Sequence, residues 1–143
     1  MVLDSGARGS TTSFVENGQG DVLVAWENEA YLSAKDYPND YEIVTPSISI
    51  LAQPSVAVVD SVDDDRDTRQ VATEYLSYLY SDEAQRIAAN HYYRPTNQKI
   101  LKEYQDVFEL NIDLDTIDDF GGWDQVQQKH FGDGGIFDQI YEK

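Results

Sequence analysis

The chain has 143 residues, enough for one domain that buries a core of its own, and it contains no cysteine, which excludes disulfide bridges and thiolate-bound metals. Its 10 Lys and Arg residues stand against 27 Asp and Glu residues, for a formal net charge of −17. A surface this acidic argues against nucleic acid and anionic membranes as partners, and it indicates either adaptation to high salt or simply a well-solvated surface.

The first element is predicted to be a loop that leads into a short helix. Residues 4–9 (DSGARG) are rich in glycine and small side chains, as loops are. The hydroxyls of residues 10–13 (STTS) can cap a helix that continues through Glu16, and Gly18 is expected to end it. Such a loop presents free backbone N–H groups at the positive end of a helix dipole, which suits an anion; an ordinary glycine-rich turn is the alternative.

An apolar run at 21–26 (DVLVAW) comes next and predicts a strand that ends on Trp26. The indole N–H of a tryptophan donates and does not accept, so Trp26 can present it to an anion held by the preceding loop. Four further elements are expected in order: a helix at 29–35, a turn at 36–40, a short strand at 41–45 and a buried strand at 55–59.

Three helices are predicted in the middle of the chain. The first, at about 68–80, has an apolar face expected to point toward a core, made of Val71, Ala72, Tyr75, Leu76 and Leu79. Ser81 is expected to cap the second, whose inner face holds Ala84, Ile87 and Ala88 and which ends before Pro95. The third, at about 97–104, carries Ile100 and Leu101 inward.

The last part of the chain is predicted to be extended at 108–117 and then helical. A helix is expected to run from Trp123 to Phe131, to stop at the glycines of 132–135, and to be followed by a terminal helix. Gly121 and Gly122, which precede Trp123, indicate either a second anion loop or, as the favoured interpretation, close packing with Trp123 in the core.

Acidic residues at 63–65 and 113–119 are the candidates for a metal site. The second group lacks the alternating oxygen ligands and central glycine of an EF-hand, and three adjacent aspartates are typical of a solvated loop. We therefore expect no bound metal and no cofactor.

Catalytic motifs are missing from the sequence, which has no G-x-S-x-G elbow, P-loop or H-E-x-x-H zinc helix. His91 and His130 lie in different helical segments without a nucleophile pattern, so they are expected to be surface or packing residues. Glu27 and Glu29 lie close to Trp26 in the sequence. They leave a minor alternative, an acidic hydrolase that uses them as acid and base. The chain is not expected to be an enzyme.

Five separated blocks give the chain a resemblance to a known family: LDSGARGST at 3–11, GDVLVAWENEA at 20–30, YEIVTPSISILAQPSVAVVD at 41–60, YLSYLYSDEAQRIAANHYYRP at 75–95 and FGGWDQVQQKHFGDGGIFDQI at 120–140. In this order they resemble the C-terminal half of the periplasmic sulfate-binding proteins that serve ATP-driven sulfate and thiosulfate importers. The resemblance implies a periplasmic location, although the chain shows no signal peptide and no run long enough to span a membrane.

The resemblance also implies an α/β fold, with the type II periplasmic-binding-protein arrangement of mixed sheets flanked by helices. Residues 1–45 would form part of the second, anion-binding lobe, 46–54 the hinge or crossover, and 55–143 part of the first lobe plus C-terminal helices. Because the family is roughly twice as long, the chain is expected to be a C-terminal fragment, from a truncated gene or an expressed piece. A homo-oligomer or strand-swapped dimer would then cover exposed sheet edges.

The expected function is binding of the sulfate ion for transport through a membrane permease. By resemblance, Ala7 contributes its backbone N–H and Trp26 its indole N–H, in a supporting loop where Gly6 and Gly9 keep the backbone accessible. Arg8 and Ser10 belong to this loop, and Arg8 is expected beside the anion without touching it. The family's other donors, a serine with the glycines that follow it and a further serine, belong to the other half, so tight binding by this chain alone is not expected.

A site made of donors also indicates which anion it prefers. Sulfate at neutral pH carries no proton and only accepts hydrogen bonds, whereas protonated phosphate would leave its O–H facing another donor, at a cost of about 1–3 kcal/mol. Thiosulfate and molybdate stay open as alternative ligands.

Overall fold

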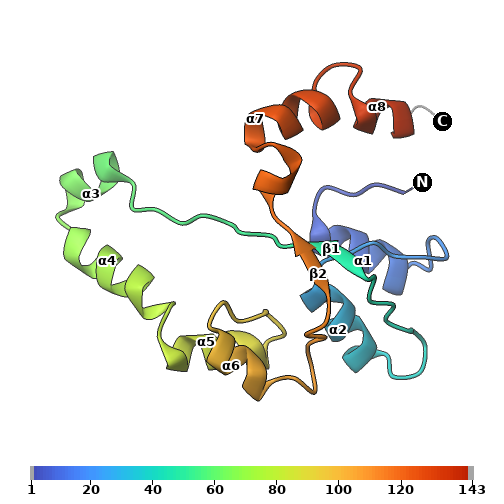
Figure 1. Cartoon of the computed structure of the whole chain (residues 1–143), viewed down its shortest axis with the longest axis horizontal. Helices are drawn as coiled ribbons and strands as arrows, with labels where there is room; N and C mark the ends of the chain where they lie inside the picture. Colours follow the sequence, from blue (N-terminus) through green and yellow to red (C-terminus); the bar gives the residue numbers. More distant parts are fainter. Residues whose placement is uncertain (1, 142–143) are drawn as a thin grey trace. The chain divides into compact units, whose positions relative to one another are not determined.

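The computed structural model describes residues 2–141 (Figure 1). These residues divide into two compact units. The larger unit comprises residues 2–44 and 55–110, and the smaller unit comprises 45–54 and 111–141. Helices prevail in both, and a small parallel sheet completes the smaller unit, which confirms the predicted α/β class.

The larger unit begins with two helices, α1 (Ala7–Val15) and α2 (Glu27–Asp36). Helix α1 starts three residues before the predicted capping hydroxyls, because Gly6 serves as N-cap and its carbonyl accepts the first helical hydrogen bond, from the N–H of Ser10 at 3.0 Å. The predicted stop is confirmed, since Gly18 has a φ of 62°, which lies in the left-handed region that does not continue a helix. Helix α2 confirms the predicted helix at 29–35.

Three predicted strands are wrong. Residues 21–26, 41–45 and 55–59 have no strand structure, and Val24 in the first is 93% exposed. A strand is stable only when its backbone pairs with a neighbour, and within residues 2–141 the paired strands are β1 and β2, both in the other unit. The β-branched residues of these segments favour an extended backbone, but within the described residues no neighbouring strand pairs with them.

The next pair of helices in the larger unit is α3 (Asp60–Arg66) and α4 (Arg69–Tyr78). The predicted helix at 68–80 is confirmed, but the solvated loop predicted at 63–65 is wrong, because these aspartates lie in α3 and Asp63 is buried. Asp63 Oδ1 accepts from the hydroxyl of Thr68 at 3.1 Å, while Oδ2 lies 2.7 Å from Arg69 Nε in an ion pair without hydrogen-bond alignment.

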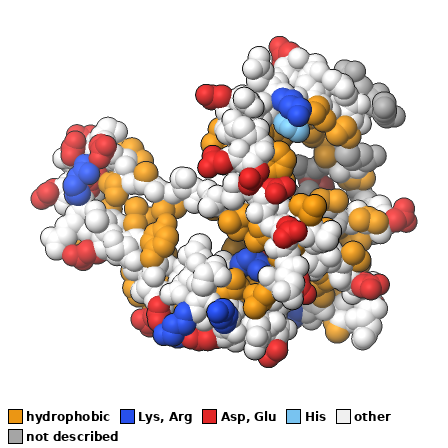
Figure 2. Space-filling view, viewed as in Figure 1, with side chains coloured by type: hydrophobic (Ala, Val, Ile, Leu, Met, Phe, Trp, Pro, Cys, Tyr) orange, Lys and Arg blue, Asp and Glu red, His pale blue; other side chains and the backbone are white. Residues whose placement is uncertain are grey.

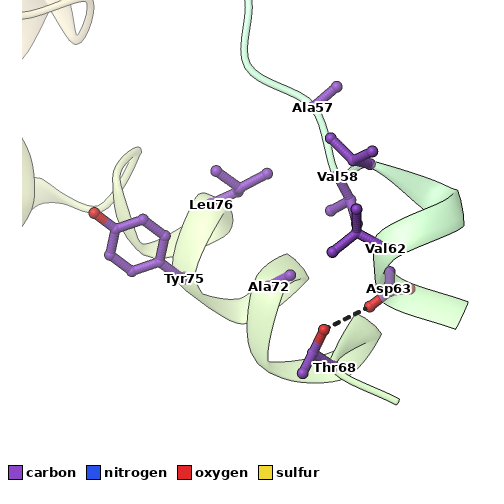
Figure 3. Close-up of a pocket in the computed structure, with 9 residues that line it drawn as sticks. Ala57, Val58, Val62, Asp63, Thr68, Ala72, Tyr75 and Leu76 are labelled. Carbon is purple, nitrogen blue, oxygen red and sulfur yellow. Dashed lines mark hydrogen bonds between the residues drawn. The ribbon is translucent and has the colours of Figure 1, made fainter. Parts of the chain in front are cut away.

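The apolar face of α4 does not point into a core as predicted. Tyr75 is 63% exposed, and the face borders a shallow cavity of about 280 Å³ between α3, α4 and residues 57–59 (Figure 3). In the space-filling view, hydrophobic side chains line the segment that holds α3 and α4 (Figure 2). The periodicity predicted the helix correctly, but within the larger unit α3 and residues 57–59 cover this face only in part.

The core of the larger unit forms around α5 (Asp82–Asn90) and α6 (Gln98–Glu103). As predicted, Ser81 caps α5, accepting the N–H of Ala84 at 3.2 Å, and Ile100 and Leu101 of α6 are buried. Ala84 faces inward as predicted, but Ile87 is exposed. Gln85 is buried on the inner face of α5 instead, where its side-chain oxygen accepts hydrogen bonds from the backbone N–H groups of residues 96 and 97.

This core reaches α2 through an aromatic contact. Ala89, Leu101 and Phe108 form the buried cluster, and Tyr31 of α2 meets the edge of the Phe108 ring at 6.0 Å between centroids. Burial raises the pKa of the Tyr31 phenol, with the nearby Glu27 carboxylate as a further cause. Helix α2 is therefore fixed to the best-packed part of the chain.

The smaller unit is built on two parallel strands, β1 (Ile48–Ile50) and β2 (Asp113–Asp115), with Ser49 opposite Leu114. Of the extended segment predicted at 108–117, three residues, 113–115, form a strand. The strand that pairs with them, residues 48–50, lies in a part of the sequence without a clear alternating pattern. The predicted lobe boundaries at 45 and 54 concern a whole protein and stay a prediction.

Short helices follow β2: η1 (Ile117–Phe120), α7 (Trp123–Val126), the π-helical η2 (Gln127–Phe131) and α8 (Ile136–Tyr141). The predicted helix to Phe131 and the stop after it are confirmed. Trp123 is 71% exposed, so its predicted place in the core is wrong. Gly121 and Gly122 both have positive φ values, and they turn the chain from η1 into α7.

Candidate anion-binding site

The backbone groups predicted to hold an anion lie at the start of α1. Ala7 is its first residue, and no side chain within residues 2–141 caps this helix end. Because the first intrahelical bond is made by Ser10, the N–H groups of residues 7–9 have no acceptor within the helix and remain available to a ligand. A side chain at Gly6 would meet no atom within 4 Å, so this end of α1 is open, whereas one at Gly9 would contact Asp4 at 3.4 Å.

Trp26 marks the start of the second helix. It is the N-cap of α2, and its carbonyl accepts the N–H groups of Glu29 at 3.0 Å and Ala30 at 3.2 Å. Its side chain is 55% exposed. The sequence predicted Trp26 at the end of a strand; the structure puts it at the positive end of a helix dipole instead, which equally suits a negatively charged ligand.

A buried carboxylate ties the two helix starts together. Glu29 of α2 is 4% exposed and accepts from Arg8 Nη2 at 2.9 Å, from the Thr11 hydroxyl at 3.0 Å and from Asn28 Nδ2 at 3.3 Å. The Thr11 hydroxyl also lies 3.1 Å from the carbonyl oxygen of Ala7, and with one hydrogen it donates to one of these acceptors at a time. Arg8 and Thr11 belong to α1, so this cluster joins residues beside Ala7 to residues beside Trp26.

A second ion pair fixes the start of α2 on its other side. Arg94 donates from Nε to Glu27 Oε2 at 2.9 Å and from Nη2 to Glu27 Oε1 at 2.6 Å. Glu27 directly follows Trp26 in the sequence. Its partner lies 67 positions away, in the segment between α5 and α6.

These contacts account for both acidic side chains next to Trp26. Glu27 and Glu29 are each paired with an arginine, as structural residues are expected to be, and neither carboxylate is left as a free acid or base. The pairing also lowers the negative charge at the start of α2, where an unpaired carboxylate would compete with a bound anion for the helix dipole. The arrangement can hold an anion with neutral N–H donors.

Sequence reasoning missed Thr11 and Arg94. Thr11 follows Arg8 by three positions, the spacing that puts two side chains on one helix face, but their partner on α2 could not be known before the helices were paired. For Arg94, no local pattern points to Glu27.

The Thr11 hydroxyl gives a direct test of the Glu29 cluster. Thr11→Val keeps the shape of the side chain but removes a donor to a buried carboxylate, and we expect the free energy of unfolding to fall by about 1 kcal/mol. Urea unfolding followed by circular dichroism measures the loss. The control is Thr12→Val on the same helix, whose hydroxyl makes no hydrogen bond to residues 2–141. Equal losses in the two variants would show that the Glu29 contact contributes nothing.

Elsewhere in residues 2–141, no three His, Asp or Glu side chains gather in a way that could hold a metal ion. The same part of the chain has no helix with the length and hydropathy needed to cross a bilayer. His91 lies in the larger unit and His130 in the smaller unit, where its ring contacts Phe131.

Comparison with known proteins gives matches along nearly the whole chain. The family described as bacterial extracellular solute-binding protein matches residues 2–94. A sulfate-binding protein of Escherichia coli is 56% identical over 99% of this chain and 44% of its own length, and a thiosulfate-binding protein of Pseudomonas aeruginosa is 49% identical over 98% of this chain and 42% of its own.

A third match is a sulfate/thiosulfate import ATP-binding protein of Cucumis sativus, which is 46% identical over 51% of this chain and 22% of its own length. The chain thus spans less than half the length of each of these three relatives.

Proposed function

This chain belongs to the bacterial extracellular solute-binding protein family, and on that premise we propose that it binds the sulfate dianion for an ATP-driven importer. The single observation that carries the proposal is the 56% identity with a sulfate-binding protein over nearly the entire chain, which includes both helix starts. The family is one of binding proteins, which confirms the prediction that the chain is not an enzyme and removes the acidic-hydrolase alternative.

The proposed ligands are the backbone N–H of Ala7 and the indole N–H of Trp26. Both are neutral donors at helix starts, where the dipole favours negative charge, and a fully ionised sulfate can accept from each. Of the residues predicted to form a supporting loop, Gly6 is the N-cap of α1, and Arg8, Gly9 and Ser10 lie in its first turn, where the Arg8 guanidinium donates to Glu29. On a chain with a net charge of −17, such a site works through short-range dipoles, since salt screens the remaining charges beyond roughly 8–10 Å.

Thiosulfate is the second candidate ligand. It is favoured by the 49% identity with the thiosulfate-binding protein of Pseudomonas aeruginosa. Thiosulfate is also a tetrahedral dianion that only accepts hydrogen bonds, so the donors described above suit it as well.

We further propose the partners, the location, the lobes and the self-association of the protein. Its partners are a membrane permease and an ATP-binding protein, in keeping with the named relative of that kind, and its location is the periplasm. The proposed lobes are residues 1–45 and 55–143 with 46–54 as the crossover, and self-association, as a homo-oligomer or a strand-swapped dimer, is the proposed state of the chain alone.

The test is a sulfate titration by calorimetry on two proteins. One is the chain itself, which we expect not to reach submicromolar affinity. The other is the Escherichia coli sulfate-binding protein with its matching segment replaced by this chain, which we expect to bind sulfate tightly. A folded graft that binds neither sulfate nor thiosulfate would refute the proposed function, and tighter binding of thiosulfate in competition would favour the second candidate.

A further inference from the structure

We propose that Arg94 is a positioning residue for this anion site, which it serves by fixing the start of α2, and with it Trp26, to the core of the larger unit. The inference rests on the proposed function. It concerns a residue that does not touch the anion and that lies 67 positions from its partner Glu27.

The contact between Arg94 and Glu27 is directional. Two N–H groups of one guanidinium meet the two oxygens of one carboxylate, at 2.9 and 2.6 Å. A bidentate pair of this kind fixes the relative orientation of both side chains, which a single point contact does not. The Arg94 side chain is only 16% exposed, so water competes little for it.

Arg94 is itself held in place by contacts with Phe108 and Glu109. Its guanidinium carbon lies 5.2 Å from the centre of the buried Phe108 ring, and Nη2 also donates to the carbonyl of Glu109 at 3.0 Å. The next residue, Pro95, is buried and restricts the backbone at Arg94. The guanidinium is therefore a rigid bridge from the core to the first residue of α2.

The position of Glu27 makes this bridge relevant to the site. Glu27 is joined to Trp26 by one peptide bond, and α2 begins there. On the other side, the Glu29 cluster ties α2 to α1 near Ala7. The Arg94 contact thus completes the support of Trp26, whose own side chain is 55% exposed.

Substitution can separate geometry from charge. Arg94→Lys keeps a positive charge near Glu27 but loses the planar fork and the stacking on Phe108. If Arg94 acted only by neutralising Glu27, the lysine variant would bind sulfate normally. If it acts by positioning, we expect Arg94→Lys to bind sulfate roughly tenfold more weakly, and Arg94→Gln to be weaker still because it also leaves Glu27 unpaired beside the anion.

The matched control is Arg86→Gln. Arg86 makes an equally bidentate pair with Glu103, with both contacts at 2.8 Å, and this pair joins α5 to α6 and involves no residue of α2. This pair lowers the pKa of the Glu103 carboxyl, chiefly through the hydrogen bond from Arg86. Arg86→Gln should leave sulfate affinity unchanged.

The experiment has two readouts. Sulfate affinity is measured by calorimetry in the grafted sulfate-binding protein, and the indole N–H signal of Trp26 is followed by NMR in the full chain carrying Trp123→Phe, which leaves one tryptophan. We expect the Arg94 variants to shift and broaden the Trp26 signal and to weaken binding, while Arg86→Gln does neither.

Unchanged sulfate affinity in Arg94→Lys overturns the inference, whatever happens to the Trp26 signal. If the parent graft binds neither sulfate nor thiosulfate, the proposed function fails, and the inference is then judged by the Trp26 signal alone, with no change in Arg94→Lys refuting it. Should the Arg94 variants fail to fold, Glu27→Gln tests the same contact, because it changes the carboxylate and leaves Arg94 against Phe108. Normal sulfate affinity together with an unchanged Trp26 signal in this variant would again refute the inference.

Discussion

Replacing Phe108 with alanine is expected to lower the stability of the larger unit by about 3–5 kcal/mol, the usual cost of removing a large side chain from a closed core. Phe108 is 1% exposed and packs against Ala89 and Leu101. It also carries the ring that Tyr31 and Arg94 contact, so the substitution loosens the support of α2 in addition to leaving a cavity.

Amide hydrogen exchange is the suitable measurement, because it reports each unit separately. Protection should fall in α5 and α6 and stay constant in β1 and β2, which belong to the smaller unit. The control is Phe120→Ala, since Phe120 is 41% exposed and should cost much less. Equal protection of α5 and α6 in the two variants would contradict the assignment of Phe108 to the core.

Replacing Trp26 with phenylalanine is expected to weaken sulfate binding by about 1.5–3 kcal/mol, which is roughly tenfold to more than a hundredfold. Phenylalanine keeps an aromatic ring at the start of α2 but removes the indole N–H, so the loss reports one hydrogen bond to a charged acceptor. Calorimetry of the grafted sulfate-binding protein measures it.

The second tryptophan provides the matched control for this variant. Trp123 is exposed and lies in the smaller unit, so Trp123→Phe should leave sulfate affinity as it was. Normal affinity in Trp26→Phe would remove Trp26 from the proposed site, whereas a loss in both variants would point to an effect on the whole protein.

The helices were largely predictable because their signals are local. Ser81 and the residues after it form an N-cap that works within one turn, and Asn97 does the same for α6 by accepting the N–H groups of Lys99 and Ile100. The strands were not predictable, because Ile48–Ile50 pairs with a segment more than 60 positions later and composition does not reveal a partner.

The same distinction applies to the candidate site. Local features put Ala7 in a loop before a helix, next to its observed place, but they put Trp26 wrongly at the end of a strand, and the functional roles of both came from resemblance. The contacts that bring the two helices together depend on tertiary packing: Glu29 meets Arg8 across 21 positions. Burial of Glu29 could not be foreseen either, since carboxylates are rarely inside unless paired.

The open apolar face of α4 and its cavity affect how this protein should be studied. Dyes such as ANS bind exposed hydrophobic surface, and a bright dye signal is commonly taken to indicate a molten globule. Here the natively packed chain already offers such a surface, with Val71 69% exposed. Dye fluorescence alone therefore does not distinguish lost packing from this native surface, and near-ultraviolet dichroism of the tyrosines is the sounder criterion.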